Sequence, residues 1–256
     1  MTFFSLAGKH ALVTGATGPL QRALAVALAE AGADVSLTTA TNELAEEVQA
    51  NSILNECWSI GRRGEALTVA LADEAAFEAA VTGLEQRIAP FDILVNAAHA
   101  APIAPFLDTD AAADAAAFTA GVASVLTPTR VVGRRMVERG QGRVVNLASI
   151  LYDRGVPNCA LYSATQGAIV GFTKSLGIEW IRSGVTVNAL GIGFYEDLAG
   201  PQQDTELHAA LERYIPLRRL GDGQDLQGAL VYLVSDEAGF VASELLVVDG
   251  AISAHG

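Results

Sequence analysis

The sequence predicts an α/β protein built as one doubly wound, Rossmann-like domain around a seven-stranded parallel sheet. Short β-branched runs alternate with longer helical stretches along the whole chain, which is the pattern of repeated strand–helix–strand units. Most residues of these runs are apolar, as in strands that are buried on both faces. No linker, repeat or change in composition divides residues 1–256, so we expect a single domain.

Each expected strand is centred on an apolar run. The runs are Ala11–Val13, Val35–Leu37, Leu67–Val69, Ile93–Val95, Val144–Leu147, Val185–Val187 and Leu245–Val248. Helices are expected at Leu20–Ala31, from Asp73 to about Ile88, at Ala111–Arg139 and at Leu161–Arg182. Asp73 is a suitable N-cap for the second of these. Ligands in such sheets bind at the carboxyl ends of the strands, so the residues directly after each strand are the candidate site.

The charge balance of the chain excludes some partners. Its 16 Lys and Arg residues stand against 29 Asp and Glu residues, which gives a formal net charge of −13. Nucleic acids and anionic membrane surfaces are bound mainly through Lys and Arg, so we expect neither as a partner. No uninterrupted apolar run reaches the roughly 18 residues of a membrane span, and residues 1–9 do not resemble a signal peptide. Cys57 and Cys159 form no disulfide framework, which indicates a reducing, cytoplasmic location.

The residues that follow the strands carry a family resemblance. They are Thr14–Gly15, Asp92–Asn96, Ser149, Tyr162 on the next helix, Val187–Ala189 and Val248–Gly250. In order and spacing the chain resembles the classical short-chain dehydrogenase/reductase family over nearly its whole length. The resemblance implies hydride transfer between NAD(P) and an alcohol or ketone, a glycine-rich coenzyme loop and an Asn–Ser–Tyr–Lys catalytic set.

The coenzyme loop departs from the family pattern of Thr-Gly, three residues, Gly, one residue, Gly. Gly15 is in place, but Pro19 and Gln21 stand where the second and third glycines belong. The pattern needs bare backbone so that amides can approach a pyrophosphate, and proline has no N–H to offer. We therefore expect a degenerate loop. The alternative is that the glycine has shifted to Gly18, with Pro19 as an ordinary first helical residue.

The segments that the resemblance places around adenosine are also altered. At the end of the second strand, Leu37–Thr41 holds neither an acid for the ribose hydroxyls nor an Arg for a 2′-phosphate. Ala70–Leu71 replaces an Asp–hydrophobic pair expected at the adenine, and Asn96–His99 replaces an Asn-Asn-Ala-Gly segment. His99 is either a new acid or base or, as we favour, a side chain that fills an empty cleft.

The catalytic set is incomplete. Ser149 and Tyr162 are present, but Gln166 occupies the position of the lysine, one helical turn after the tyrosine. In the family this lysine lowers the pKa of the tyrosine and holds the nicotinamide ribose. A free phenol has a pKa of about 10, and a neutral amide does not stabilise its phenolate as an ammonium does. Lys174 lies about 18 Å further along the helix and Lys9 precedes the first strand, so neither replaces the missing lysine.

Three further positions differ from the family. Gly121 falls where the asparagine is expected, Ile192–Gly193 replaces a Pro-Gly pair, and Asp197 lies where a threonine holds the coenzyme. A carboxylate at that place would repel a pyrophosphate. Arg154, on the loop after Ser149, is expected to be a solvated loop residue.

These losses lead to the prediction of a non-catalytic subunit that binds no coenzyme. Ser149 and Tyr162 would be remnants, while Asn96 would belong to a retained framework. The chain would support a homologous, active short-chain dehydrogenase subunit, in a heterotetramer that oxidises a hydroxyacyl-CoA with NAD. Its contacts would come from Ala111–Arg139, Leu161–Trp180 and Leu245–Ser253.

Three alternatives stay open. The first is an active NAD(P)-dependent alcohol dehydrogenase or ketoreductase with relaxed motifs. The second is a lyase that resembles halohydrin dehalogenases, which use an Arg where this chain has Gln166. The third is a small-ligand sensor with a cleft near His99, Ser149, Tyr162, Tyr195 and Asp197.

Overall fold

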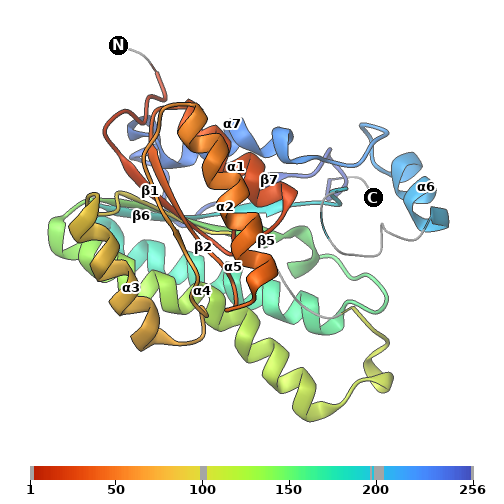
Figure 1. Ribbon diagram of the computed structural model, residues 1–256. Helices are drawn as coiled ribbons and strands as arrows, with labels where there is room; N and C mark the ends of the chain where they lie inside the picture. The colour runs from red at the N-terminus through yellow and green to blue at the C-terminus, as the bar shows by residue number, and fades with distance from the viewer. Residues whose placement is uncertain (1–2, 99–102, 197, 199–204, 255–256) are drawn as a thin grey trace.

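Seven parallel strands form a single sheet with helices on both of its faces (Figure 1). The computed structural model describes residues 3–98, 103–196, 198 and 205–254. The strands are β1 (His10–Thr14), β2 (Asp34–Thr38), β3 (Ala66–Leu67), β4 (Ile93–Asn96), β5 (Gly142–Ser149), β6 (Val185–Ile192) and β7 (Leu245–Val248). Their spatial order is β3-β2-β1-β4-β5-β6-β7, so the strand order reverses between β1 and β4. The predicted doubly wound, seven-stranded parallel sheet is confirmed.

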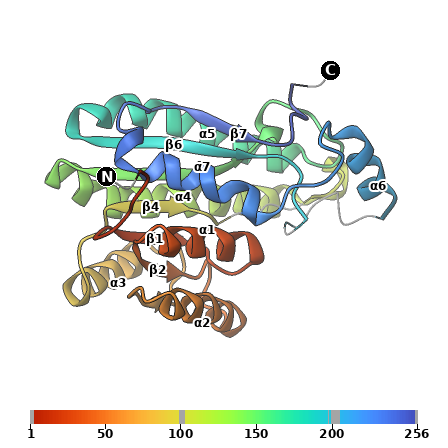
Figure 2. The same cartoon turned by 90° about the horizontal axis from the view of Figure 1, so that it is seen from above.

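The helices form two layers. They are α1 (Pro19–Glu30), α2 (Leu44–Ser59), α3 (Glu74–Arg87), α4 (Ala111–Arg139), α5 (Ala160–Trp180), α6 (Thr205–Tyr214) and α7 (Gly223–Val234). One layer holds α1, α2 and α7, and the opposite layer holds α3, α4 and α5 (Figures 1 and 2). Figure 1 shows α6 apart from both layers, at the end of the molecule where the C-terminus lies.

The core follows from the alternation of side chains along buried strands. In β1, Ala11 and Val13 belong to the apolar cluster beneath α1 and α7. Leu12 points the other way, into the cluster that includes Phe77 of α3 and Val132 of α4. All residues of β1, β4 and β6, and all residues of β5 except Arg143, are buried, because helices cover both sides of these strands. This double cover leaves the strand ends as the places where side chains can meet a ligand.

Three helices, α2, α6 and α7, are not among those expected from the sequence. In α2, Ala50, Ile53, Leu54 and Cys57 are buried at the spacing of one helical face, although charged residues around them obscure the pattern. In α7, the Asp222 side chain accepts from the backbone of the first turn in a capping box.

Two boundaries also differ from expectation. The third strand is Ala66–Leu67 rather than Leu67–Val69, because the Val69 N–H donates to the Thr39 hydroxyl instead of extending the ladder. α5 ends at Trp180 and continues as a short 3₁₀ turn, Ile181–Ser183. The predicted N-cap is confirmed, since Asp73 accepts from the Ala76 N–H at 3.0 Å.

α4 is long and apolar enough to cross a membrane by length and composition, but a helix of a protein core passes the same test. It packs between α3 and α5, and Arg130 and Arg135 on α4 pair with Glu74 and Glu85 on α3. A helix held in this way belongs to the layer over the sheet. The cytoplasmic location stays a prediction.

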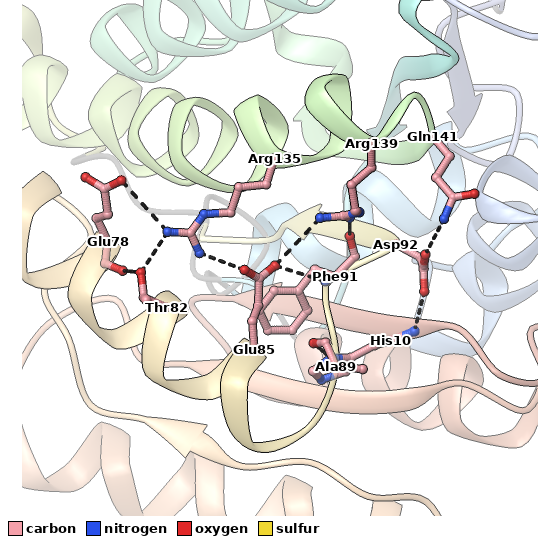
Figure 3. Close-up of polar contacts among 10 residues, drawn as sticks. All are labelled: His10, Glu78, Thr82, Glu85, Ala89, Phe91, Asp92, Arg135, Arg139 and Gln141. Carbon is pink, nitrogen blue, oxygen red and sulfur yellow. Dashed lines mark hydrogen bonds and ion pairs between the residues drawn. The ribbon is translucent and has the colours of Figure 1, made fainter.

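A polar network joins α3 and α4 to the amino-terminal ends of the central strands (Figure 3). The candidate site lies at the opposite, carboxyl ends of these strands. Glu85 accepts from Arg135 Nη1 at 2.8 Å and from the Phe91 N–H at 3.1 Å. Nearby, His10 is 2% exposed and its Nδ1 lies 2.8 Å from the Ala89 carbonyl oxygen. The network fixes the amino ends of β1 and β4, which run on to the site.

Candidate active site

Gly15, in the loop after β1, occupies a position that suits only glycine. Gly15 has φ = +63°, and a Cβ there would lie 2.6 Å from the Cα of Ala98. A side chain at this position is therefore excluded both by conformation and by the close approach of the segment after β4. Gly18 is the N-cap of α1 and Pro19 its first helical residue. The alternative of a shifted glycine is thus confirmed for the start of this helix.

The Gln21 side chain lies between Gly18 and the segment after β4. Its Nε2 donates to the Ala97 carbonyl oxygen at 2.9 Å, and only 7% of the residue is exposed. A Cβ on Gly18 would lie 2.8 Å from the Gln21 Oε1. The bare backbone at Gly18 thus makes room for the side chain that replaces the third glycine.

The N-terminus of α1 fits an anion. No side chain caps it, and its first turn holds no acidic residue. The N–H groups of Leu20 and Gln21 in the first turn have no partner within the helix, and they carry the positive end of its dipole. Pro19 offers no N–H, but at the first helical position this costs little. A pyrophosphate can therefore bind here through backbone amides.

Ser149 and Tyr162 come together at the carboxyl end of β5. The Ser149 hydroxyl hydrogen-bonds to the Tyr162 phenol and also accepts from the Leu151 N–H at 3.2 Å. Burial raises the pKa of Tyr162 well above its ordinary value of about 10, while the bond to Ser149 acts in the opposite direction. The phenol is therefore protonated at neutral pH. It can act as a proton donor.

Gln166 lies one turn after Tyr162 on α5 and is 2% exposed. Its Oε1 is buried and has no hydrogen-bond partner among the residues that the structure describes. An unpaired buried acceptor is costly, so the arrangement fits a ligand that brings a hydroxyl donor. The amide carries no charge, and it does not lower the pKa of the phenol as a lysine would.

Asn96 belongs to a buried network at the end of β4. Its Nδ2 donates to Thr129 Oγ1 at 2.8 Å and to Asn146 Oδ1 at 2.7 Å. Asn146 in turn donates to Thr173 Oγ1 at 2.9 Å. The Asn96 Oδ1 and the Thr14 Oγ1, at the ends of two adjacent strands, are buried and have no partner in the described part of the chain. As expected, Asn96 is framework, and it also presents an acceptor at the strand ends.

The structure shows no role at the site for the other candidate residues that it describes. Gly121 is partly buried in α4 and brings no side chain. Tyr195 is a core residue, 2% exposed, whose hydroxyl donates to the Val248 carbonyl oxygen at 2.9 Å. His99 and Asp197 fall outside the described residues. Arg154 is not a free loop residue, because its guanidinium bonds to the Tyr214 hydroxyl at 2.8 Å.

One acidic residue at the site is missed by the sequence analysis. Glu46, in the first turn of α2, accepts from the backbone N–H groups of Ala40 and Thr41 directly after β2. The end of the second strand therefore does hold a carboxylate, although none stands within Leu37–Thr41 itself. The spacing of the buried residues in α2 is the signal that could have revealed it.

A dinucleotide coenzyme fits these residues. The close glycine contact, the uncapped helix and the unpartnered polar atoms of Thr14, Asn96 and Gln166 lie on elements that converge at the carboxyl ends of the strands. This is the region where open α/β sheets bind their ligands, next to the reversal of strand order. Backbone amides would hold the phosphates, and the buried acceptors would face ribose hydroxyls.

Comparisons with known proteins agree with this geometry. The family model described as enoyl-(acyl carrier protein) reductase matches residues 15–253. The gluconate 5-dehydrogenase of Gluconobacter oxydans is 31% identical over 255 residues, covering 98% of this chain and 96% of the relative.

Two solved structures are also similar. The crystal structure of a gluconate 5-dehydrogenase from Burkholderia cenocepacia, in complex with NADP and tartrate, has a TM-score of 0.90 and 29% identity, covering 98% of this chain and 97% of that one. A candidate short-chain alcohol dehydrogenase from Sinorhizobium meliloti has a TM-score of 0.92 and 30% identity, and both chains are covered completely.

Two expectations are corrected by these findings. The prediction of a non-catalytic subunit is wrong, because the full-length relatives are oxidoreductases. The prediction that no coenzyme binds is wrong as well, since a structure of nearly the same length holds NADP. The physical reason is that α1 begins without a side-chain cap among the described residues and without an acidic residue in its first turn, so its N-terminus still suits a phosphate although two glycines are replaced. The chain belongs to the short-chain dehydrogenase/reductase family.

Proposed function

We propose that this chain is an NAD(P)-dependent oxidoreductase that interconverts a carbonyl group and a secondary alcohol. The observation that carries the proposal is the hydrogen-bonded pair of Ser149 and Tyr162 at the same strand ends as the uncapped N-terminus of α1. The pair offers two hydroxyl donors to a carbonyl oxygen. The helix offers a site for the phosphates of the coenzyme.

Tyr162 is the group that moves the proton. In reduction, the substrate oxygen accepts hydrogen bonds from Tyr162 and Ser149, which stabilise the negative charge that develops on it. The phenol then donates its proton to this oxygen as the C–H bond forms. The coenzyme, when bound, supplies the hydride for reduction or accepts it in oxidation. Ser149 orients the phenol and shares the charge on the oxygen.

Gln166 affects how fast the reduction and the oxidation run at a given pH. Reduction needs the protonated phenol, which burial favours, because it raises the pKa of Tyr162. Oxidation needs the phenolate as a base, and the neutral amide of Gln166 does not stabilise a phenolate. We therefore propose that the enzyme reduces carbonyl groups at neutral pH and oxidises alcohols efficiently only in alkaline solution.

Tyr162 belongs to a buried apolar cluster. Its other buried members include Ile150, Leu151, Phe194, Leu211, Ile215, Leu220 and Ile252. Burial in this cluster shields the phenol from water and strengthens its interaction with a developing charge. Two of the relatives named above are gluconate 5-dehydrogenases, so sugar acids belong in the first set of substrates to test, together with less polar ketones.

Coenzyme binding and turnover test the proposal separately. Calorimetric titration with NADH and NADPH is expected to give saturable binding of at least one coenzyme. Coenzyme oxidation with a panel of ketones and keto sugar acids is expected to show turnover. Tyr162→Phe should lower kcat by about 100-fold or more, since it removes the proton donor, and should leave coenzyme affinity within about threefold. The proposal would be refuted if neither coenzyme binds, or if Tyr162→Phe is fully active.

Association with a homologous subunit in a heterotetramer stays a prediction. Exposed apolar side chains lie on the elements expected to form its contacts, including Phe118 on α4, Ile178 on α5 and Val247 on β7. Co-purification from the native source, followed by mass spectrometry of the intact complex, tests it. A homo-oligomer without a second chain would contradict it.

A further inference from the structure

We infer that Glu46 sets the coenzyme preference of this chain, selecting NAD(H) against the 2′-phosphorylated NADP(H). This inference rests on the proposed function, because it concerns the same coenzyme. It distinguishes this chain from the relative from Burkholderia cenocepacia, whose structure holds NADP.

Glu46 occupies an anion-binding turn directly after β2. Its Oε2 accepts from the Ala40 N–H at 2.9 Å and from the Thr41 N–H at 2.7 Å. Two successive N–H groups that point to one place form a concave site for an anionic oxygen. Here an internal carboxylate already fills that site. Both of its bonds are charge-assisted, and such bonds are shorter and stronger than neutral ones.

The turn adjoins the coenzyme loop. The Ala16 N–H donates to the Thr38 carbonyl oxygen at 2.8 Å, and the Gly15 N–H lies 3.4 Å from the Thr38 hydroxyl. The residues after β2 therefore sit beside the glycine loop that precedes α1. In this type of fold the end of the second strand meets the adenosine ribose, where an acid binds the 2′-hydroxyl and an Arg accommodates a 2′-phosphate.

The charges around the turn oppose a phosphate. Residues 31–61 contain no Lys or Arg, while Glu43 and Glu47 flank Glu46 at the start of α2. Arg22 of α1 is paired with Glu56, which lies further along α2 than Glu46. A 2′-phosphate would have to displace Glu46 from both amides and would leave its carboxylate next to the phosphate. Like charges held this close repel each other.

The hydroxyl groups of the turn are already engaged. Thr39 is buried, and its Oγ1 accepts from the Val69 N–H at 3.1 Å. The Thr41 Oγ1 accepts from the Glu43 N–H at 3.3 Å. In contrast, Glu46 uses Oε2 for its two backbone bonds, so the lone pairs of Oε1 can accept from a ribose hydroxyl. The turn therefore matches a coenzyme with a free 2′-hydroxyl.

Calorimetric titration of wild-type and variant protein with NADH, NADPH, ADP-ribose and 2′-phospho-ADP-ribose tests the inference without a turnover assay. The wild type is expected to bind each unphosphorylated ligand at least about tenfold more tightly than its 2′-phosphorylated counterpart. Glu46→Gln keeps the size of the side chain and removes its charge. It should therefore lower the ratio of the affinity for each unphosphorylated ligand to that for its 2′-phosphorylated counterpart about tenfold. It should change NADH affinity by less than about threefold.

Glu47→Gln is the matched control, because it removes the same charge from the same helical turn without touching the two amides. It is expected to change the ratio by less than about twofold. Thr41→Arg is a second variant, which adds a cation beside Glu46 and should raise the affinity for the 2′-phosphorylated ligands. If Glu46→Gln does not fold, the wild-type ratio and Thr41→Arg decide the question.

The outcomes separate the two proposals. If neither coenzyme binds, the proposed function fails, and the role of Glu46 fails with it. If both coenzymes bind equally well, or NADPH binds more tightly, the proposed function stands and the role of Glu46 is overturned. Equal effects of Glu46→Gln and Glu47→Gln would also overturn it, because they would show a diffuse effect of charge.

Discussion

The Gln21 Nε2 donates to the Ala97 carbonyl oxygen at 2.9 Å, which joins the first turn of α1 to the segment after β4. The bond spans the place where the coenzyme loop and β4 meet. It gives a structural role to a residue that replaces a glycine of the family pattern. Because Gly18 leaves room for this side chain, the two positions form one unit.

The coupling of Gly18 and Gln21 is testable by unfolding. Gln21→Ala leaves the buried Ala97 carbonyl oxygen without this partner, so we expect a loss of about 1 kcal/mol in the free energy of unfolding. Gly18→Ala places a methyl group 2.8 Å from the Gln21 Oε1, and we expect a similar loss. In the Gln21→Ala background, Gly18→Ala should cost little, because φ = −140° and ψ = 174° are open to alanine. Additive losses in urea unfolding would contradict the coupling.

Gln166→Lys is expected to change the pH dependence of oxidation. A lysine one turn after Tyr162 would stabilise the phenolate, which burial by itself disfavours. The rate of alcohol oxidation at neutral pH should rise about tenfold or more, and the rise of the rate with pH should move to lower pH. Ala164→Lys is the control, since residue 164 is exposed on the same helix. Identical pH–rate profiles for wild type and Gln166→Lys would show that Gln166 does not control the phenol.

His10 is expected to make the protein less stable in mild acid. Its Nδ1 donates to the Ala89 carbonyl oxygen at 2.8 Å, so in the neutral ring Nε2 accepts from the Ser36 hydroxyl at 2.9 Å. Burial lowers the pKa of His10 below its ordinary value of 6.5, although Ala89 and nearby carboxylates oppose the shift. Below pH 6.5 the unfolded chain therefore binds more protons, and stability falls as the pH falls.

Urea unfolding between pH 7.5 and 5.5 measures this contribution. His10→Gln should lose part of the pH dependence of the free energy of unfolding, because the group that titrates is gone. His208→Gln is a suitable control, since this side chain is 37% exposed. An unchanged slope in His10→Gln would show that the buried imidazole does not contribute.

The pair of Glu85 and Arg135 is expected to stabilise the contact between α3 and α4. The two side chains are only 14% and 20% exposed, and their atoms lie 2.8 Å apart (Figure 3). A double-mutant cycle with Glu85→Gln and Arg135→Met should give a coupling of about 1 kcal/mol or more. Arg130 and Glu74 join the same helices at 2.7 Å but are 52% and 42% exposed, so their coupling should stay below about 0.5 kcal/mol. Equal couplings would show that burial does not matter here.

The sequence predicts much of the site because certain residue types must follow strands in this fold. Ser149, Tyr162 and Gln166 are found where their spacing places them. The prediction of a non-catalytic subunit without coenzyme was wrong because each residue that differs from the family pattern was treated as a lost function. A side chain that replaces a glycine blocks a loop only if it points into the loop, and the sequence does not show that Gln21 points toward Ala97.

The doubly wound sheet and the Ser–Tyr pair without its lysine can both be predicted from the amino-acid sequence. Local rules suffice for this, because apolar runs, caps and helical spacing act between residues that are close along the chain. The folded structure is needed to show that Gly18 makes room for Gln21, and that a carboxylate from α2 lies on the amides after β2. Both facts depend on the direction of a side chain across a gap between elements, and that direction is set by packing.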